Sequence, residues 1–233
     1  MKETYQIVSV KDGKQDSADI LQILRKIKAG SLPNDLKLLN YYHEVPISYA
    51  AKIDAVEDDS IEVSAQKAQA VVLGLQKQCL MTSAHFPQGL GVHCFVEYVN
   101  AKNCCAVLGR FAYASIRAHR RAAVRVKVEE RIQACYKAAG QEISGHISDI
   151  SASGIALESQ GEAPTGLEES GFLVMFLQGK NFDIPAQHIK SRRHDEVFIH
   201  SFRIEPDKQA DTQISQYVYS RQVEIIRQLK EQL

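Results

Sequence analysis

Ile143-Ser-Gly-His-Ile-Ser-Asp149-Ile-Ser151-Ala-Ser-Gly154-Ile-Ala-Leu157 is the stretch that decides how the second half of this chain folds. Apolar residues flank a polar centre with one glycine, a pattern typical of a strand, a tight turn and a second strand. Asp149 and Ser151 are two positions apart, so on an extended chain their side chains point the same way. Gly154 permits a backbone conformation or a close approach that a side chain would block.

Other short strands are predicted on both sides of this stretch. Valines 124, 126 and 128 alternate with charged residues, and apolar runs follow at 172–177, 184–189 and 197–204. The chain from residue 36 to residue 113 also reads as short strands joined by turns, including one strand at 70–73. Short strands at this spacing predict a mainly β protein with two small antiparallel barrel or split-barrel domains in tandem, at 1–115 and 116–233.

One helix is predicted near each end of the chain. Ser17 is a candidate N-cap, the isoleucines and leucines of residues 20–27 recur near helical spacing, and Gly30 can end the helix. After Pro206 the apolar period is again helical and predicts a C-terminal helix. Its apolar stripe can pack on its own barrel or on another copy, and the first is the default.

A basic cluster, Arg117-Ala-His-Arg-Arg-Ala-Ala-Val-Arg125, lies between the two β-rich halves. It has four arginines in nine residues, although the formal net charge of the 233-residue chain is +0. Arginine presents a planar fork of donors that suits phosphates and purine edges. Because the positive charge is local, it indicates a discrete anionic ligand held near a domain boundary rather than a surface that coats nucleic acid.

The composition excludes several classes of protein. Apolar residues make up 45% of the chain and charged residues 24%, as in ordinary globular proteins. No apolar run reaches the ~20 residues of a membrane helix, and the first residues lack the apolar core of a signal peptide. The five cysteines form no CxxC pair, which favours reduced thiols and a cytoplasmic protein. No Ser-His-Asp order, glycine-rich phosphate loop or metal-ligand spacing is found, so we expect neither an enzyme nor a catalytic cofactor nor a metal site.

Taken together, the two motifs resemble the PilZ domain, the bacterial receptor for cyclic di-GMP. The resemblance rests on the RxxxR spacing of Arg121 and Arg125 and on the DxSxxG spacing of Asp149, Ser151 and Gly154, about two dozen residues later. It extends to the strand order and the trailing helix, and so covers residues 116–233. The first half resembles, in architecture only, the N-terminal split-barrel domain of flagellar-brake-type PilZ proteins.

The resemblance implies a role for each matching residue. Arg121 and Arg125 would bind phosphates and the Hoogsteen edges of guanine, and Asp149 would accept from a guanine Watson–Crick edge. Ser151 and the backbone at Gly154 would close the floor of the site. Arg120, directly before the motif, goes in this family with an intercalated ligand dimer, so two molecules of cyclic di-GMP are expected. The family's Gly-x-x-Phe pattern is broken here, because Ile199 stands in place of the glycine.

Three functions follow from the resemblance. The first is a receptor in which cyclic di-GMP changes the orientation of the two domains and so regulates motility or biofilm-related targets. Its protein partner would be a flagellar motor component or part of a biofilm or secretion system. The second is a cyclic di-GMP-responsive transcription regulator, against which the neutral pI, the lack of a recognisable helix-turn-helix and the few aromatic residues argue. The third is an adaptor that has lost ligand binding, against which the intact motifs argue.

Overall fold

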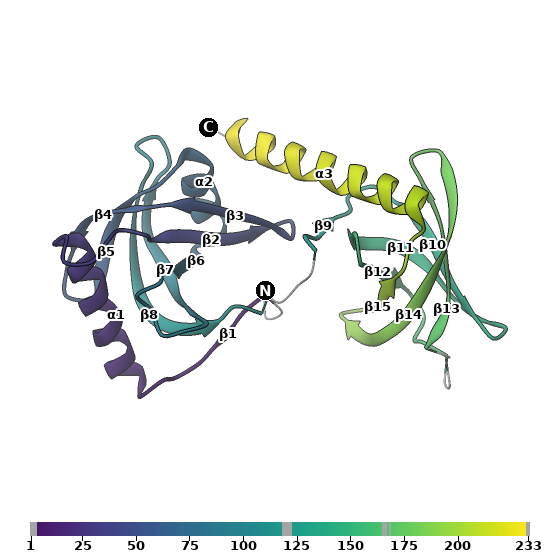
Figure 1. Cartoon of the computed structure of the whole chain (residues 1–233), viewed down its shortest axis with the longest axis horizontal. Helices are drawn as coiled ribbons and strands as arrows, with labels where there is room; N and C mark the ends of the chain where they lie inside the picture. The colour runs from purple at the N-terminus through teal and green to yellow at the C-terminus, as the bar shows by residue number, and fades with distance from the viewer. Residues whose placement is uncertain (1–3, 118–122, 165–166, 168, 232–233) are drawn as a thin grey trace. The chain divides into compact units, whose positions relative to one another are not determined.

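The computed structural model describes residues 4–117, 123–164, 167 and 169–231. The chain forms two compact units, one made of residues 1–42, 46–121 and 226–233, and the other of residues 43–45 and 122–225. Both units are built on antiparallel sheets, with one helix near each end of the chain (Figure 1). The predicted fold class, mainly β with an N-terminal and a C-terminal helix, is confirmed.

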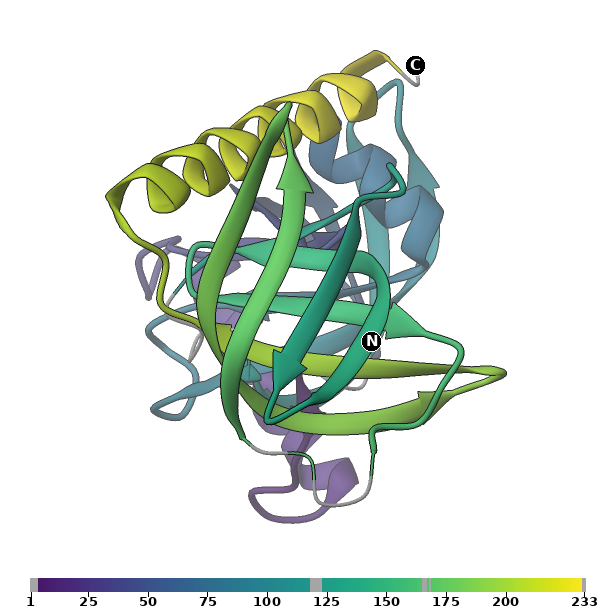
Figure 2. The same cartoon turned by 90° about the vertical axis from the view of Figure 1, so that its right-hand side faces the viewer.

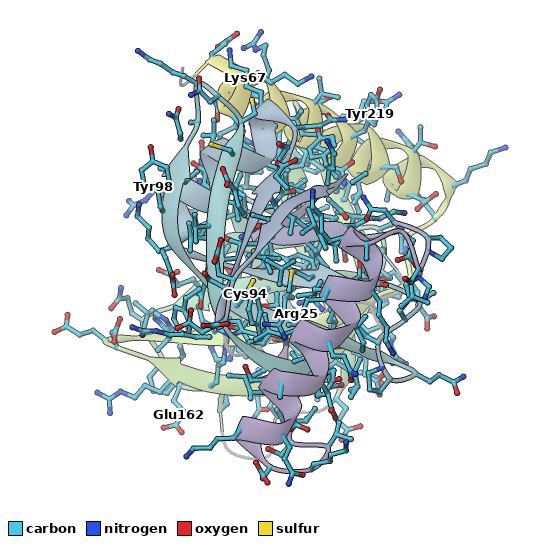
Figure 3. All side chains as sticks on the ribbon, turned by 90° about the vertical axis from the view of Figure 1, so that its left-hand side faces the viewer. Arg25, Lys67, Cys94, Tyr98, Glu162 and Tyr219 are labelled. Atoms are coloured by element: carbon cyan, nitrogen blue, oxygen red, sulfur yellow. The ribbon has the colours of Figure 1, made fainter. Side chains whose placement is uncertain are left out.

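The first unit is an eight-stranded sheet with the order β3-β2-β6-β7-β8-β5-β4, and β1 pairs with β8. Its main core joins α1 to one face of this sheet. Cys94 lies fully buried within the sheet, whereas Tyr98 on the same strand is exposed (Figure 3). The elements are β1 (Gln6–Ile7), α1 (Gly13–Lys28), β2 (Lys37–Tyr42), β3 (Val45–Ala50), β4 (Lys52–Val56), β5 (Ser60–Ser64), α2 (Lys67–Gln76), β6 (Gln78–Thr82), β7 (Leu90–Asn100) and β8 (Cys105–Ser115).

Helix α1 begins earlier than the sequence pattern suggested. Its N-cap is Asp12, whose carboxylate accepts from the backbone N–H groups of Lys14 and Gln15, and the predicted Ser17 cap is wrong. Aspartate is as good a cap as serine, so the first turn could start at either position. The end is as predicted, because Gly30 takes a φ of 74° directly after the C-cap.

Residues 70–73, predicted as a strand, belong to helix α2. All six residues from Ala68 to Leu73 are buried, so the helix shows no alternation of apolar and polar faces. A short apolar run of this kind fits a buried strand and a buried helix equally well. Because α2 is buried on all sides, its sequence lacks the apolar and polar periodicity that would distinguish a helix from a strand.

The second unit is a closed barrel. Six strands follow the order β10-β13-β14-β15-β12-β11, and β10 also pairs with β11, which closes the ring. Strand β9 pairs with the end of β11, on the same edge of that strand as β10 and opposite β12. Figure 2 faces this unit, with its teal and green strands curving round a common interior. Its elements are β9 (Val126–Lys127), β10 (Gln133–Ala138), β11 (Gln141–Ser151), β12 (Gly154–Ser159), β13 (Ser170–Leu177), β14 (Lys180–His194), β15 (Val197–Ile204) and α3 (Lys208–Glu231).

A β-bulge in β11 sets which residues face the barrel interior. Ile147 pairs with Leu157, but the next pair joins Asp149 to Ala156, so Ser148 is an extra residue. Ile147 and Ile150 are three positions apart, yet both are fully buried. The bulge thus keeps both isoleucines in the core and directs Asp149 to the outer face.

Two histidines of the barrel belong to one chain of hydrogen bonds, in which His200 and Ser159 are buried, His188 is partly buried and Ser191 is exposed. His188 Nε2 lies 2.9 Å from Ser191 Oγ, which lies 2.7 Å from His200 Nδ1. On its other side, His200 Nε2 lies 2.9 Å from Ser159 Oγ, which donates to the carbonyl of Gly161. Burial lowers the pKa values of both imidazoles below their ordinary value. These hydrogen bonds therefore satisfy the neutral imidazole of His200 in the barrel interior.

Helix α3 begins after Asp207, whose carboxylate accepts from the backbone N–H of Ala210 at 2.8 Å. Further along, Arg221 is nearly buried and its guanidinium contacts Glu129 at 3.0 Å and also Glu224. Glu129 lies in the segment between β9 and β10, so this ion pair joins α3 to the start of the barrel. None of the helices in the described parts of the chain has the length and the apolar character that crossing a bilayer would require.

Candidate functional site

The DxSxxG residues lie on the outer face of the barrel. Inward-facing residues of neighbouring strands, such as Val126, Ile150 and Phe202, are at most 3% exposed. Residues one position away along each strand therefore face outward. Two cross-strand rows result, and each lies on this outer face. One row holds Lys127, Asp149, Ala156, Ser201 and Lys190, and the next holds Ser151, Gly154, Arg203 and Gln187.

Arg125 and Asp149 come from the two predicted motifs and lie near each other in the structure. Arg125 directly precedes β9, and β9 pairs with the β11 segment that carries Asp149. Arg125 Nη1 is 3.9 Å from Asp149 Oδ1, with 35% and 21% of the two side chains exposed. That separation is too long for a hydrogen bond, which needs about 2.7–3.0 Å for charged partners. The guanidinium and the carboxylate therefore form an ion pair without a hydrogen bond.

Ser151 and Gly154 close the turn between β11 and β12. Ser151 is 2% exposed, and its hydroxyl donates to the carbonyl oxygen of Gly154 at 3.1 Å. A Cβ added at Gly154 would lie 3.0 Å from the carbonyl oxygen of Phe202 on β15. The glycine therefore permits a close approach of two strands and not an unusual φ. The role of Ser151 as a direct ligand contact stays a prediction.

The remaining predicted site residues, Arg120 and Arg121, lie outside the described residues, as does His119. Arg117 is described, and its guanidinium donates to the side chain of Gln6 in β1. This contact ties Arg117 to β1 of the first unit. The structure thus brings together Arg125, Asp149, Ser151 and Gly154.

A polar hollow that neither motif predicted continues the same outer face. It has a volume of about 360 Å³ and is lined by Arg131, Gln133, Ser144, Gly145, His146, Glu158, Ser159, Gln160 and Gly161. His146 and Glu158 are register partners, and His146 Nε2 lies 3.5 Å from Glu158 Oε1. Across the described ranges, no three His, Cys, Asp or Glu side chains gather in a way that could hold a metal ion. The sequence gave no signal for this hollow, because its residues come together through strand register.

The second unit is a closed β-barrel whose outer face carries the described residues of both motifs. Residues 117–220 match the family model of the PilZ domain, so this part of the chain is a PilZ domain. This family comprises non-catalytic receptors for cyclic di-GMP, and the resemblance stated from the two motifs is confirmed. No match to the chain is found among curated proteins.

Several solved structures are similar to this chain at low identity. MrkH of K. pneumonia in complex with c-di-GMP is 11% identical, with a TM-score of 0.47, and the match covers 96% of this chain and 99% of the MrkH chain. YcgR of Escherichia coli in complex with c-di-GMP is 15% identical, with a TM-score of 0.44 and coverages of 96% and 100%. The inhibitor of motility MotI/DgrA of Bacillus subtilis is 14% identical, with a TM-score of 0.42 and coverages of 81% and 95%. At these values the likeness supports no conclusion about function.

Proposed function

We propose that the chain is a cyclic di-GMP receptor that binds its ligand on the outer face of the barrel. The observation that carries this proposal is the pairing of Arg125 with Asp149, which unites a phosphate-binding fork and a guanine-accepting carboxylate on one surface. A carboxylate next to the cation would repel a simple inorganic anion, whereas a guanine offers it the N1–H and N2–H donors. The full predicted set of ligand-binding residues is Arg120, Arg121, Arg125, Asp149, Ser151 and Gly154.

Arg120, directly before the RxxxR motif, supports a stoichiometry of two ligand molecules per chain. In the family, an arginine at the position of Arg120 goes with an intercalated dimer of the ligand, so two molecules of cyclic di-GMP would bind each chain. Each guanidinium–phosphate contact is charge-assisted and contributes about 1.5–3 kcal/mol. A few such contacts supply enough differential affinity to shift a two-state equilibrium.

The signal that this binding produces would be a change in domain orientation. We assign residues 1–115 to an N-terminal split-barrel-like domain and residues 116–233 to the PilZ domain, with the basic cluster at the boundary. Ligand binding orders the boundary segment and changes how a protein partner is recognised. The partner would be a cytoplasmic component of the flagellar motor or of a biofilm or secretion system.

Isothermal titration with cyclic di-GMP tests the binding. Micromolar or tighter binding with two molecules per chain is the expected result, and no binding at micromolar concentrations would overturn the proposal. Arg121→Ala, Arg125→Ala and Asp149→Asn should each weaken binding about tenfold or more, because each removes a charged partner of the ligand. Arg25→Ala is the matched control, since Arg25 lies on α1 and donates to the carbonyl of Glu57.

A gel shift with and without cyclic di-GMP separates the receptor from the transcription-regulator alternative. A receptor that acts through a protein partner shows no shift in either condition. A ligand-dependent shift would instead assign the output of the same site to nucleic acid.

A further inference from the structure

Arg203 on β15 shares a cross-strand row with two residues of the DxSxxG motif. Ser151 pairs with Gly154, and Gly154 pairs with Arg203. Strands in a sheet lie about 4.8 Å apart, so Arg203 Cα is about 10 Å from Ser151 Cα across the row. Phe202 and Ile204, its neighbours along β15, are both 3% exposed, so Arg203 faces outward with Asp149 and Ser151.

The environment of Arg203 leaves its charge available to a ligand. The side chain is exposed, and within the described residues it forms no ion pair. Gly154, directly opposite, has no side chain to cover the guanidinium. Glu205, the nearest acidic residue along the chain, lies beyond the end of β15 and does not pair with it.

The outer face carries more cations than anions around this position. Lys127 and Lys190 occupy the adjacent row, in which Asp149 is the one acidic side chain among the described partners. Arg125 approaches that row from the β9 side. Arg203 lies on the opposite side of the β11–β12 turn, so a dianionic ligand that spans the face would meet a cation at each end.

We propose that Arg203 binds a phosphate of the ligand, at the β12–β15 end of the site. This inference rests on the proposed function, since it concerns the same bound dinucleotide. It adds a residue that belongs to neither sequence motif. A phosphate accepts from a guanidinium or from an ammonium, whereas a guanine edge requires the paired donors of arginine for bidentate contact.

Isothermal titration of cyclic di-GMP into the full chain tests the assignment, with Arg203→Ala, Arg203→Met and Arg203→Lys compared to wild type. The neutral variants should bind about 10- to 100-fold more weakly, the loss expected for one charge-assisted contact. Arg203→Lys should stay within about fivefold of wild type, since lysine also binds phosphate as a point charge. Arg193→Ala is the matched control, because Arg193 lies on β14 opposite Phe198 and donates to the carbonyl of Asp195.

The outcomes distinguish this inference from the function on which it rests. If wild type itself does not bind, both are overturned. If wild type binds and the neutral variants bind within threefold of it, the role of Arg203 alone is overturned. If Arg203→Lys is as weak as Arg203→Ala, the contact is not to a phosphate. Arg203→Met keeps the aliphatic stem, so a thermal midpoint equal to wild type shows that a loss of binding is not a loss of fold.

Discussion

Gly145 of β11 offers a sharp test of the barrel register. A Cβ added there would lie 2.1 Å from the carbonyl oxygen of Glu158 and 2.9 Å from its carbonyl carbon, whereas ordinary contacts begin at 3.4 Å. The backbones of β11 and β12 would therefore have to separate by about 1 Å in a closed ring, where neither strand can move freely. Overpacking that side chains can absorb costs about 1–3 kcal/mol. We expect Gly145→Ala to cost about 3 kcal/mol or more.

Urea unfolding of the full chain, followed by circular dichroism, measures this cost. With a slope of about 2 kcal/mol per M, a loss of about 3 kcal/mol moves the midpoint of the barrel transition down by about 1.5 M. Gly161→Ala is the matched control, because nothing lies within 4 Å of its added Cβ. It should be neutral or slightly stabilising, since alanine restricts the unfolded chain. Gly154→Ala should fall between the two, near 1 kcal/mol, because its Cβ meets the Phe202 carbonyl at 3.0 Å.

The loss of stability should be largest for Gly145→Ala, intermediate for Gly154→Ala and smallest for Gly161→Ala. A midpoint for Gly145→Ala that drops no further than that of Gly161→Ala would refute the register of β11 and β12. An equal loss in all three variants would show that the cost arises from glycine replacement in general and not from close strand approach.

Two further predictions concern buried charge. Burial lowers the pKa of His200 in the folded protein. As the pH falls, the unfolded state therefore binds a proton before the folded state does. The stability that neutral His200 provides is present above the unfolded pKa of about 6.5 and is lost as the pH falls through the lowered folded pKa. The thermal midpoint should therefore fall between pH 7 and pH 5, and His200→Asn, unlike the exposed His194→Asn, should flatten that dependence. Replacing both Glu129 and Glu224 with alanine leaves the buried Arg221 cation without its partners and should cost about 3 kcal/mol in urea unfolding. Arg221→Met, which removes the charge and keeps the stem, should cost less; an equal or larger loss would contradict this account.

Part of the candidate site could be read from local spacing. Asp149 and Ser151, two positions apart, share a face because a strand has a period of two. The spacing of Ile147 and Ile150 was also a readable sign of a bulge, since two buried residues three apart break that period. Alternation alone does not predict such a bulge, because it places every second residue on the same face. The bulge is what places Asp149 on the outer face.

Other features depended on competition between local signals. Asp12 and Ser17 are both good caps, and only the contacts of the first turn decide between them. Asp16 is buried and accepts from the backbone N–H groups of Val10 and Lys11, which fixes the helix start upstream. In the same way, the apolar run of α2 took its helical form from burial on all sides.

The sequence by itself determined the mainly β class, most strands, both terminal helices and the two motifs of the PilZ domain, because these depend on periods and spacings within short segments. Only the tertiary structure decided that the barrel closes through β10 and β11 and that Arg203 stands opposite Gly154. Strand register is set by hydrogen bonds between segments far apart in the chain and by the fit of their buried faces. A residue such as Arg203, which has no motif of its own, therefore becomes part of the candidate site only when the barrel folds.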